Sequence, residues 1–196
     1  DDTIVVYDGP GLFSAPRVWW MFRVMGAKNV LLLDGGLDGW RAEGRPLTDK
    51  PVQTAPAVFN AKLDEERVAS LEAMLQLVED ATAQIADARP AGRFTGAEPE
   101  PRAGMRSGHM PGARNVPASA LSRDGRLLPP DELRALFEGA GVDLSRPVVT
   151  SCGSGVTAAV ISLALETVGH SDHRLYDGSW SEWGGRADTP VESGEA

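Results

Sequence analysis

The stretch "RPVVTSCGSGVTAAVISLALETVG" (146–169) decides the fold of this chain. Its first part, "RPVVTSC" (146–152), is short and rich in β-branched residues, as is typical of a buried strand. "VTAAVISLALETVG" (156–169) predicts an apolar helix ended by Gly169, and "HRLYDGS" (173–179) predicts a second strand. Strand, helix and strand in succession predict an α/β fold with a parallel sheet flanked by helices.

The same pattern occurs near the start of the chain and indicates an internal duplication. The first copy consists of a predicted strand "TIVVYD" (3–8), a helix "APRVWWMFRVMG" (15–26) and a strand "NVLLLDGG" (29–36). Asp8 lies 26 positions before Asp34, and Cys152 lies 25 positions before Asp177. Asp8 occupies the place of Cys152, so only the second copy can carry out thiol chemistry.

A linker is predicted between the copies at "TDKPVQTAPAV" (48–58), which is rich in proline and small polar residues. We therefore expect residues 1–47 to be the C-terminal part of an inactive first domain and residues 59–196 to be a catalytic second domain. Only three residues precede "IVVYD", whereas about ninety precede the strand of the cysteine in the second domain. We expect the front of the first domain to be absent from this chain, with a separate N-terminal fragment as one possible source.

Three further elements are predicted within the second domain. They are a helix near 70–80 with Ser70 as its N-cap, a strand at 83–89 and a helix at 129–141 that proline opens and glycine closes.

Composition and charge exclude several classes of function. The formal net charge of −9 argues against nucleic acid as a partner, because neutralising phosphates needs a basic face. The sequence has no apolar run long enough to span a bilayer and does not start like a secretory signal, so we expect a cytoplasmic protein with no membrane association. The single cysteine cannot form an internal disulfide, and His170 and His173 lack the neighbours that a metal site needs.

The loop around Cys152 has the composition of an anion-binding turn. A thiol with a pKa near 8.5 is mostly protonated at neutral pH, so a nucleophilic cysteine needs a stabilised thiolate. Gly153 and Gly155 let successive backbone N–H groups face inward, the following helix adds its positive end, and Ser154 and Thr157 add hydroxyl donors. The alternative is a buried structural thiol.

A cysteine phosphatase is a second chemical alternative to be weighed against this interpretation. Its loop needs an arginine six residues after the cysteine to hold the phosphoryl oxygens, and position 158 is alanine. Phosphate transfer therefore lacks the cation that it requires.

Several motifs together resemble the tandem-domain rhodanese family of sulfurtransferases. "CGSGVTA" (152–158), "GHMPGARNVP" (108–117), "DARPAGRFTGAEPEPRAG" (87–104) and "YDGSWSEWG" (176–184) are similar to its second domain. The stretch 13–36 resembles the back half of its inactive first domain, so the resemblance covers essentially the whole chain. It implies a rhodanese-like fold in tandem, duplicated domains.

The resemblance also implies a substrate and a set of site residues. Members that use thiosulfate carry positive side chains directly after the cysteine, whereas the neutral Gly153 and Ser154 resemble members that use 3-mercaptopyruvate. Arg93 and Arg102 match arginines that hold the carboxylate and keto group of that substrate. The full set of expected site residues is Cys152, Ser154 and Thr157 for catalysis, and Arg93, Arg102, Gly153, Gly155 and Val156 for substrate binding.

The expected reaction passes through a persulfide on Cys152, formed as pyruvate leaves. An acceptor thiol such as thioredoxin, or cyanide, then takes the outer sulfur; no cofactor is implied. A thiosulfate sulfurtransferase and a non-catalytic sulfur-carrier or interaction module remain as alternatives.

Three conspicuous side chains are expected to have structural roles. Asp87 and Arg89 predict an ion pair near the site, and His109 lies in a glycine- and proline-rich turn.

Overall fold

The computed structural model describes residues 2–10 and 12–195. Its centre is a five-stranded sheet in which every neighbouring pair of strands is parallel, in the order β3-β9-β8-β4-β5. The strands are β3 (Val68–Ala69), β4 (Gln84–Asp87), β5 (Arg114–Asn115), β8 (Val148–Ser151) and β9 (His173–Tyr176). This arrangement confirms the expected α/β fold with a parallel sheet.

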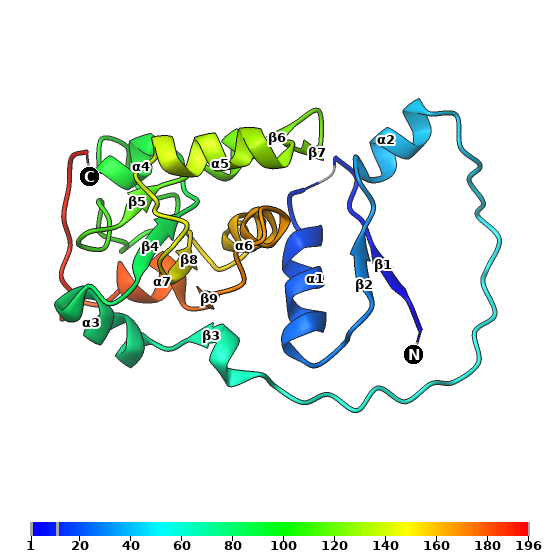
Figure 1. Cartoon of the computed structure of the whole chain (residues 1–196), viewed down its shortest axis with the longest axis horizontal. Coiled ribbons are helices and arrows are strands. Elements are labelled where there is room, and N and C mark those ends of the chain that lie inside the picture. Colours follow the sequence, from blue (N-terminus) through cyan, green and yellow to red (C-terminus); the bar gives the residue numbers. More distant parts are fainter. Residues whose placement is uncertain (1, 11, 196) are drawn as a thin grey trace.

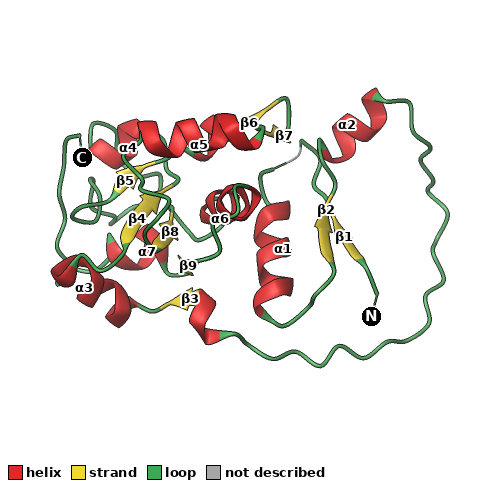
Figure 2. Ribbon diagram, viewed as in Figure 1, coloured by secondary structure: helices red, strands yellow, loops and turns green. Residues whose placement is uncertain are grey.

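Helices cover both faces of this sheet (Figure 2). They are α3 (Leu71–Asp80), α4 (Ala91–Thr95), α5 (Pro130–Gly139), α6 (Ala158–Thr167) and α7 (Ser179–Trp183), with short 3-10 turns η1 (Glu65–Arg67) and η2 (Ala118–Ala120). A small antiparallel hairpin of β6 (Ser122–Arg123) and β7 (Arg126–Leu127) precedes α5.

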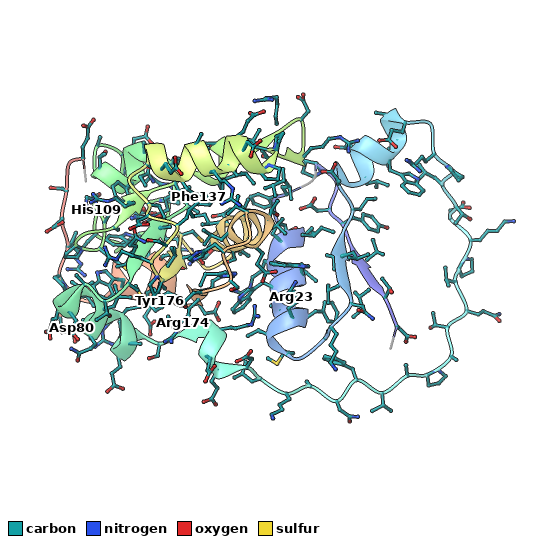
Figure 3. All side chains as sticks on the ribbon, viewed as in Figure 1. Arg23, Asp80, His109, Phe137, Arg174 and Tyr176 are labelled. Carbon is teal, nitrogen blue, oxygen red and sulfur yellow. The ribbon has the colours of Figure 1, made fainter. Side chains whose placement is uncertain are left out.

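Alternation along the strands divides the core into two clusters. Val148 and Leu175 pack with α5 and α6, whereas the adjacent Val149 and Tyr176 pack with α3 and α7. Successive strand residues point to opposite faces, so a parallel strand with helices on both sides is apolar throughout. Figure 3 labels one residue of each cluster, Tyr176 and Phe137, the latter on α5.

Helix α6 is buried on nearly all sides because it lies between two layers. One side faces the five-stranded sheet, and the other packs against α1 (Ala15–Val24) of the first copy (Figure 1). Seven of its ten residues are buried, which explains its largely apolar sequence. The helix begins at Ala158 rather than at the expected position 156, because the residues before it form the cysteine loop.

The first copy repeats the core of the second. Strands β1 (Ile4–Val6) and β2 (Val30–Leu32) are parallel and flank α1 along the chain, and α2 (Gly36–Ala42) follows. Ile4 pairs with Val30, and in the second copy Val148 pairs with His173, which reproduces the offsets of 26 and 25 positions seen in the sequence.

The segment from residue 43 to residue 64 contains no helix or strand, and it is exposed throughout. It runs from α2 around the first copy to η1 and β3 in Figure 1 and includes the predicted linker at 48–58. No helix in the described ranges combines the length and apolar character that crossing a membrane requires.

Ser70 caps α3 as predicted, since its Oγ accepts a hydrogen bond of 3.2 Å from the N–H of Ala73. We expect Ser70→Ala to lower the free energy of unfolding by about 1 kcal/mol, because one N-terminal amide of the helix loses its partner. Urea denaturation at pH 7 measures this loss. Ser171→Ala, in an exposed loop, is the matched control and should leave the midpoint unchanged.

Candidate active site

Cys152 follows the last residue of β8 directly, at the carboxyl end of the central strand. It is only 1% exposed, yet it lines a cavity of about 310 Å³. Ligands of parallel α/β sheets bind at this edge, because the loops that leave the strands meet there. Cys152 is thus accessible through the cavity rather than from the open surface.

Helix α7 holds the start of the cysteine loop in place through its backbone. The N–H of Cys152 donates to Ser179 Oγ at 3.2 Å, and the carbonyl of Cys152 accepts from the N–H of Trp180 at 2.9 Å. The carbonyl of Gly153 accepts from both the N–H and the Oγ of Ser181, at 2.8 and 2.6 Å. These bonds fix the residues on either side of the cysteine α-carbon.

The amide N–H groups of residues 153–158 make no hydrogen bond to any described residue. They lie between the cysteine and the first turn of α6, whose N-cap is Thr157. Successive unpaired amides at a helix N-terminus are an anion-binding arrangement, since their partial positive charges add to that of the helix. The loop can therefore stabilise negative charge without a cationic side chain.

The first copy shows how such a loop binds an anion. Asp8 occupies the position of the cysteine, and its Oδ2 accepts hydrogen bonds of 2.9, 2.8 and 3.0 Å from the amides of Phe13, Ser14 and Ala15. The residue before them, Leu12, has a positive φ of 45°. In the first copy the carboxylate of the chain itself fills the loop.

The cysteine loop has a similar backbone plan but is one residue shorter, since six positions separate Cys152 from Ala158 and seven separate Asp8 from Ala15. Helix α6 begins at Ala158 as α1 begins at Ala15, and Gly155, three residues earlier, has a φ of +79°. The amides of Val156, Thr157 and Ala158 therefore correspond to the three that bind Asp8. By this correspondence, these three amides are the candidate donors to a negatively charged sulfur on Cys152.

Arg93 and Arg102 line the same cavity as Cys152. Arg93, on α4, lies with Nη1 3.5 Å from Glu100 Oε2, and Arg102 Nη1 donates to Ser181 Oγ at 2.5 Å. Because Ser181 also donates to Gly153, a short chain of hydrogen bonds connects Arg102 to the cysteine loop. Two guanidinium groups and a loop without charged side chains thus line the same cavity.

Seven of the eight predicted site residues line this cavity: Cys152, Ser154, Thr157, Arg93, Arg102, Gly153 and Val156. Gly155 is absent from the lining and packs instead against Asp177, whose carbonyl oxygen would lie 2.8 Å from an added Cβ. The lining residues that were not proposed as site residues are Phe13, Glu100, Pro101, Met105, Trp180 and Ser181.

A buried ion cluster supports the wall of the cavity, and it includes the predicted pair. Arg89 Nη2 lies 2.6 Å from Asp87 Oδ2, and Arg89 Nη1 lies 2.8 Å from Glu100 Oε1. The same guanidinium lies 4.2 Å from the ring centre of Trp180, a cation–π contact. Burial alone would lower the pKa of Arg89, but Asp87 and Glu100 outweigh it and raise that pKa. The cluster therefore holds Glu100 beside Arg93.

The structure places His109 in the core rather than in the cavity lining. Its ring stacks on Phe94 with 3.9 Å between centroids, and Nδ1 lies 2.9 Å from the carbonyl oxygen of the same residue. These contacts agree with the structural role expected for this histidine. Within the described ranges, no three histidine, cysteine or carboxylate side chains form a metal-binding group.

Fold and site together define a parallel α/β domain that holds a buried cysteine thiol in a cavity at the carboxyl edge of its sheet. The rhodanese-like domain profile matches residues 1–43 and 70–186. The chain belongs to the rhodanese-like family and is a sulfurtransferase.

Individual relatives agree with this assignment. The chain is 50% identical over 192 residues to the 3-mercaptopyruvate sulfurtransferase of Escherichia coli K12, covering 98% of this chain and 68% of the relative. It is 46% identical over 202 residues to rat (Rattus norvegicus) thiosulfate sulfurtransferase, and the match covers 100% of this chain and 68% of the rat protein. Rhodanese-fold similarity extends to the crystal structure of SseA from Escherichia coli, with a TM-score of 0.82, 47% identity and coverage of 93% and 68%.

The anion-binding loop of the first copy can be tested through Asp8. Partial burial alone would raise the pKa of Asp8, but the hydrogen bonds from Ala15, Ser14 and Phe13 outweigh it and hold that pKa below its ordinary value. We expect Asp8→Ala to lower the free energy of unfolding at pH 7 by about 1 to 2 kcal/mol, the range for loss of a helix N-cap.

The loss should depend on pH with a definite sign. Because the folded chain binds the Asp8 proton less tightly than the unfolded chain, this stabilisation is present above pH 3.8 and is lost as pH falls through the lower folded-state pKa. Urea denaturation of both proteins below about pH 4 should show the gap narrowing. Asp38→Ala, an exposed change on α2, is the control; a gap that stays constant with pH would contradict the ionic interpretation.

Proposed function

We propose that the chain transfers sulfur from 3-mercaptopyruvate to a thiol acceptor through a persulfide on Cys152. The observation that carries this proposal is the shared cavity, where Cys152 and a loop without charged side chains lie together with Arg93 and Arg102. The donor has one carboxylate beside a ketone, and planar guanidinium groups suit such oxygens. A doubly charged donor such as thiosulfate would gain more from cations within the loop itself, at Gly153 and Ser154.

In the first half-reaction, Arg93 and Arg102 hold the carboxylate and keto oxygens so that the sulfur of the donor lies beside Cys152. The Cys152 thiolate attacks that sulfur, and an S–S bond forms as the S–C bond breaks. The electron pair of the broken bond passes to the enolate of pyruvate, which takes up a proton through a relay that includes Ser154. Pyruvate leaves, and Cys152 carries the persulfide.

In the second half-reaction, the acceptor removes the outer sulfur. The amides of residues 153–158 and the hydroxyl of Thr157 stabilise negative charge on the persulfide, as an oxyanion hole stabilises oxygen. A thiolate such as that of reduced thioredoxin or of a small thiol, or cyanide, attacks the outer sulfur, and the S–S bond breaks to regenerate the Cys152 thiolate. Because Cys152 is so deeply buried, the acceptor must reach it through the cavity.

Both copies contribute to this reaction in our proposal. We assign residues 1–47 to the end of a silent first domain, 48–58 to the linker and 59–196 to the catalytic domain. Phe13, which lines the cavity, comes from the loop before α1, so the substrate cleft is bounded by both copies. The silent copy thus forms part of the wall of the site.

Intact-mass analysis after exposure to 3-mercaptopyruvate tests the nucleophile. The wild-type chain should gain the mass of one sulfur atom, and a reducing thiol should remove it. Cys152→Ser should gain nothing, because it lacks the only thiol. A folded wild-type chain that gains no sulfur from 3-mercaptopyruvate but gains it from thiosulfate would replace our donor with the alternative one.

The two arginines should act mainly on binding of the donor. We expect Arg93→Gln and Arg102→Gln each to raise KM for 3-mercaptopyruvate roughly 10- to 100-fold, the loss of one charge-assisted hydrogen bond, with a smaller change in kcat. Steady-state pyruvate release measures both constants. Arg123→Gln, an exposed arginine outside the cavity lining, is the control. An unchanged KM in both cavity variants would refute their assigned role.

A further inference from the structure

Arg17 of the first copy reaches across to the cysteine loop of the second. Its Nη1 donates to Asp177 Oδ1 at 2.5 Å and to the carbonyl oxygen of Gly155 at 3.3 Å. Its guanidinium lies 4.7 Å from the ring centre of Trp20, on the same helix α1, and the side chain is only 19% exposed. The contact with Trp20 therefore restrains the Arg17 side chain independently of its hydrogen bonds to the cysteine loop.

The contact with Gly155 fixes the orientation of one peptide group. In a trans peptide the C=O and the following N–H point in opposite directions, so a carbonyl directed toward Arg17 turns the N–H of Val156 away from it. Val156 lines the cavity, and its amide corresponds to that of Phe13, which donates to Asp8 in the first copy. Rotation of this peptide would remove one donor from the cysteine and present a carbonyl oxygen instead.

Gly155 packs against Asp177, but its carbonyl has no hydrogen bond from within the loop among the described residues. The carbonyls of Cys152 and Gly153 are bonded to α7, but that of Gly155 has Arg17 as its hydrogen-bond donor among the described residues. Gly155 has a positive φ, and glycine crosses between backbone conformations at little steric cost. An external contact is therefore needed to keep the Val156 amide directed toward the site.

We propose that Arg17 is a positioning residue that locks the Gly155–Val156 peptide in the orientation that stabilises negative sulfur on Cys152. This rests on the proposed function only in that the stabilised group is the reacting sulfur. Through Arg17 the first copy then contributes to the chemistry by controlling the backbone of the second, and Arg17 itself lies outside the cavity lining.

Alkylation of Cys152 by iodoacetamide across a range of pH tests this proposal without any sulfur donor. In Arg17→Leu we expect the rate at pH 7 to fall roughly three- to tenfold and the pH profile to move upward, because the thiolate loses a donor. The rates should converge at high pH, where the thiol is fully ionised in both proteins. Arg93, Glu100 and Arg102, the charged groups of the cavity, are unchanged in this variant.

In steady-state kinetics, we expect Arg17→Leu to lower kcat roughly tenfold and to change KM less than twofold. This fall in kcat is smaller than that caused by outright removal of an oxyanion-hole donor. Arg17→Lys keeps a cationic donor and should recover most of this loss. Asp177→Asn, which weakens the hold on Arg17 without altering α1, should reproduce a smaller effect and serves as the second variant if Arg17→Leu does not fold.

Arg23 provides a closely matched control. It lies on the same helix (Figure 3), 5.0 Å from the ring centre of Trp19, and its Nη1 lies 2.9 Å from Glu166 Oε2 in the second copy. Arg23→Leu thus removes an equivalent contact between the copies that does not involve the cysteine loop. It should leave the alkylation profile and kcat unchanged.

Two results would overturn the proposal. One is an Arg17→Leu profile that coincides with the wild type, and the other is an equal shift in Arg23→Leu, which would indicate a general loss of contact between the copies. Failure of the wild type to take sulfur from 3-mercaptopyruvate would count against the proposed donor, while the alkylation comparison would still test Arg17.

Discussion

The site depends on one electrostatic constraint, which is that unpaired backbone amides at the N-terminus of a helix favour a negatively charged acceptor. In the first copy the carboxylate of Asp8 accepts hydrogen bonds from three of them. In the second copy the corresponding amides have no partner among the described residues, and the side chain at the equivalent position is the thiol of Cys152. Similar backbone plans therefore give a capped loop in one copy and a loop of unpaired amides beside a thiol in the other.

The position of α6 explains why this loop can be so bare. The helix is enclosed by the five-stranded sheet on one side and by α1 on the other, so its axis is fixed by packing rather than by its ends. A helix that depends on its own N-cap could not leave these amides unpaired without losing stability. The free energy gained by burying the body of α6 offsets the cost of leaving its N-terminal amides unpaired. In our proposal, these amides stay available to the sulfur of Cys152.

Local sequence was sufficient for much of this account, because β8, the cysteine loop and α6 are consecutive in the chain. Arg93 and Arg102 were predicted from a resemblance, and the structure brings both to the cavity of Cys152. Glu100 and Ser181 were missed: Glu100 pairs with Arg89 and Arg93, 11 and 7 positions away, and Ser181 acts through Arg102 and Gly153, 79 and 28 positions away. The position of Ser181 could have been inferred from the sequence. Ser181 lies on α7, which follows β9, and β9 is the neighbour of the strand β8 that precedes Cys152. The contact of Arg17 could not be inferred in this way, because its target lies 138 positions away across the contact between copies.

The contact between the two strand–helix–strand units then has a physical rationale. A loop made mainly of glycine and small residues gives close approach to backbone amides, but the same composition leaves its peptides free to rotate. Large side chains inside the loop would restrain it only by filling the space that the substrate needs. Restraint has to come from outside, and α7 supplies it at Cys152 and Gly153 while α1 supplies it at Gly155. A silent copy that carries no thiol can therefore still determine how well the thiol of its neighbour is stabilised.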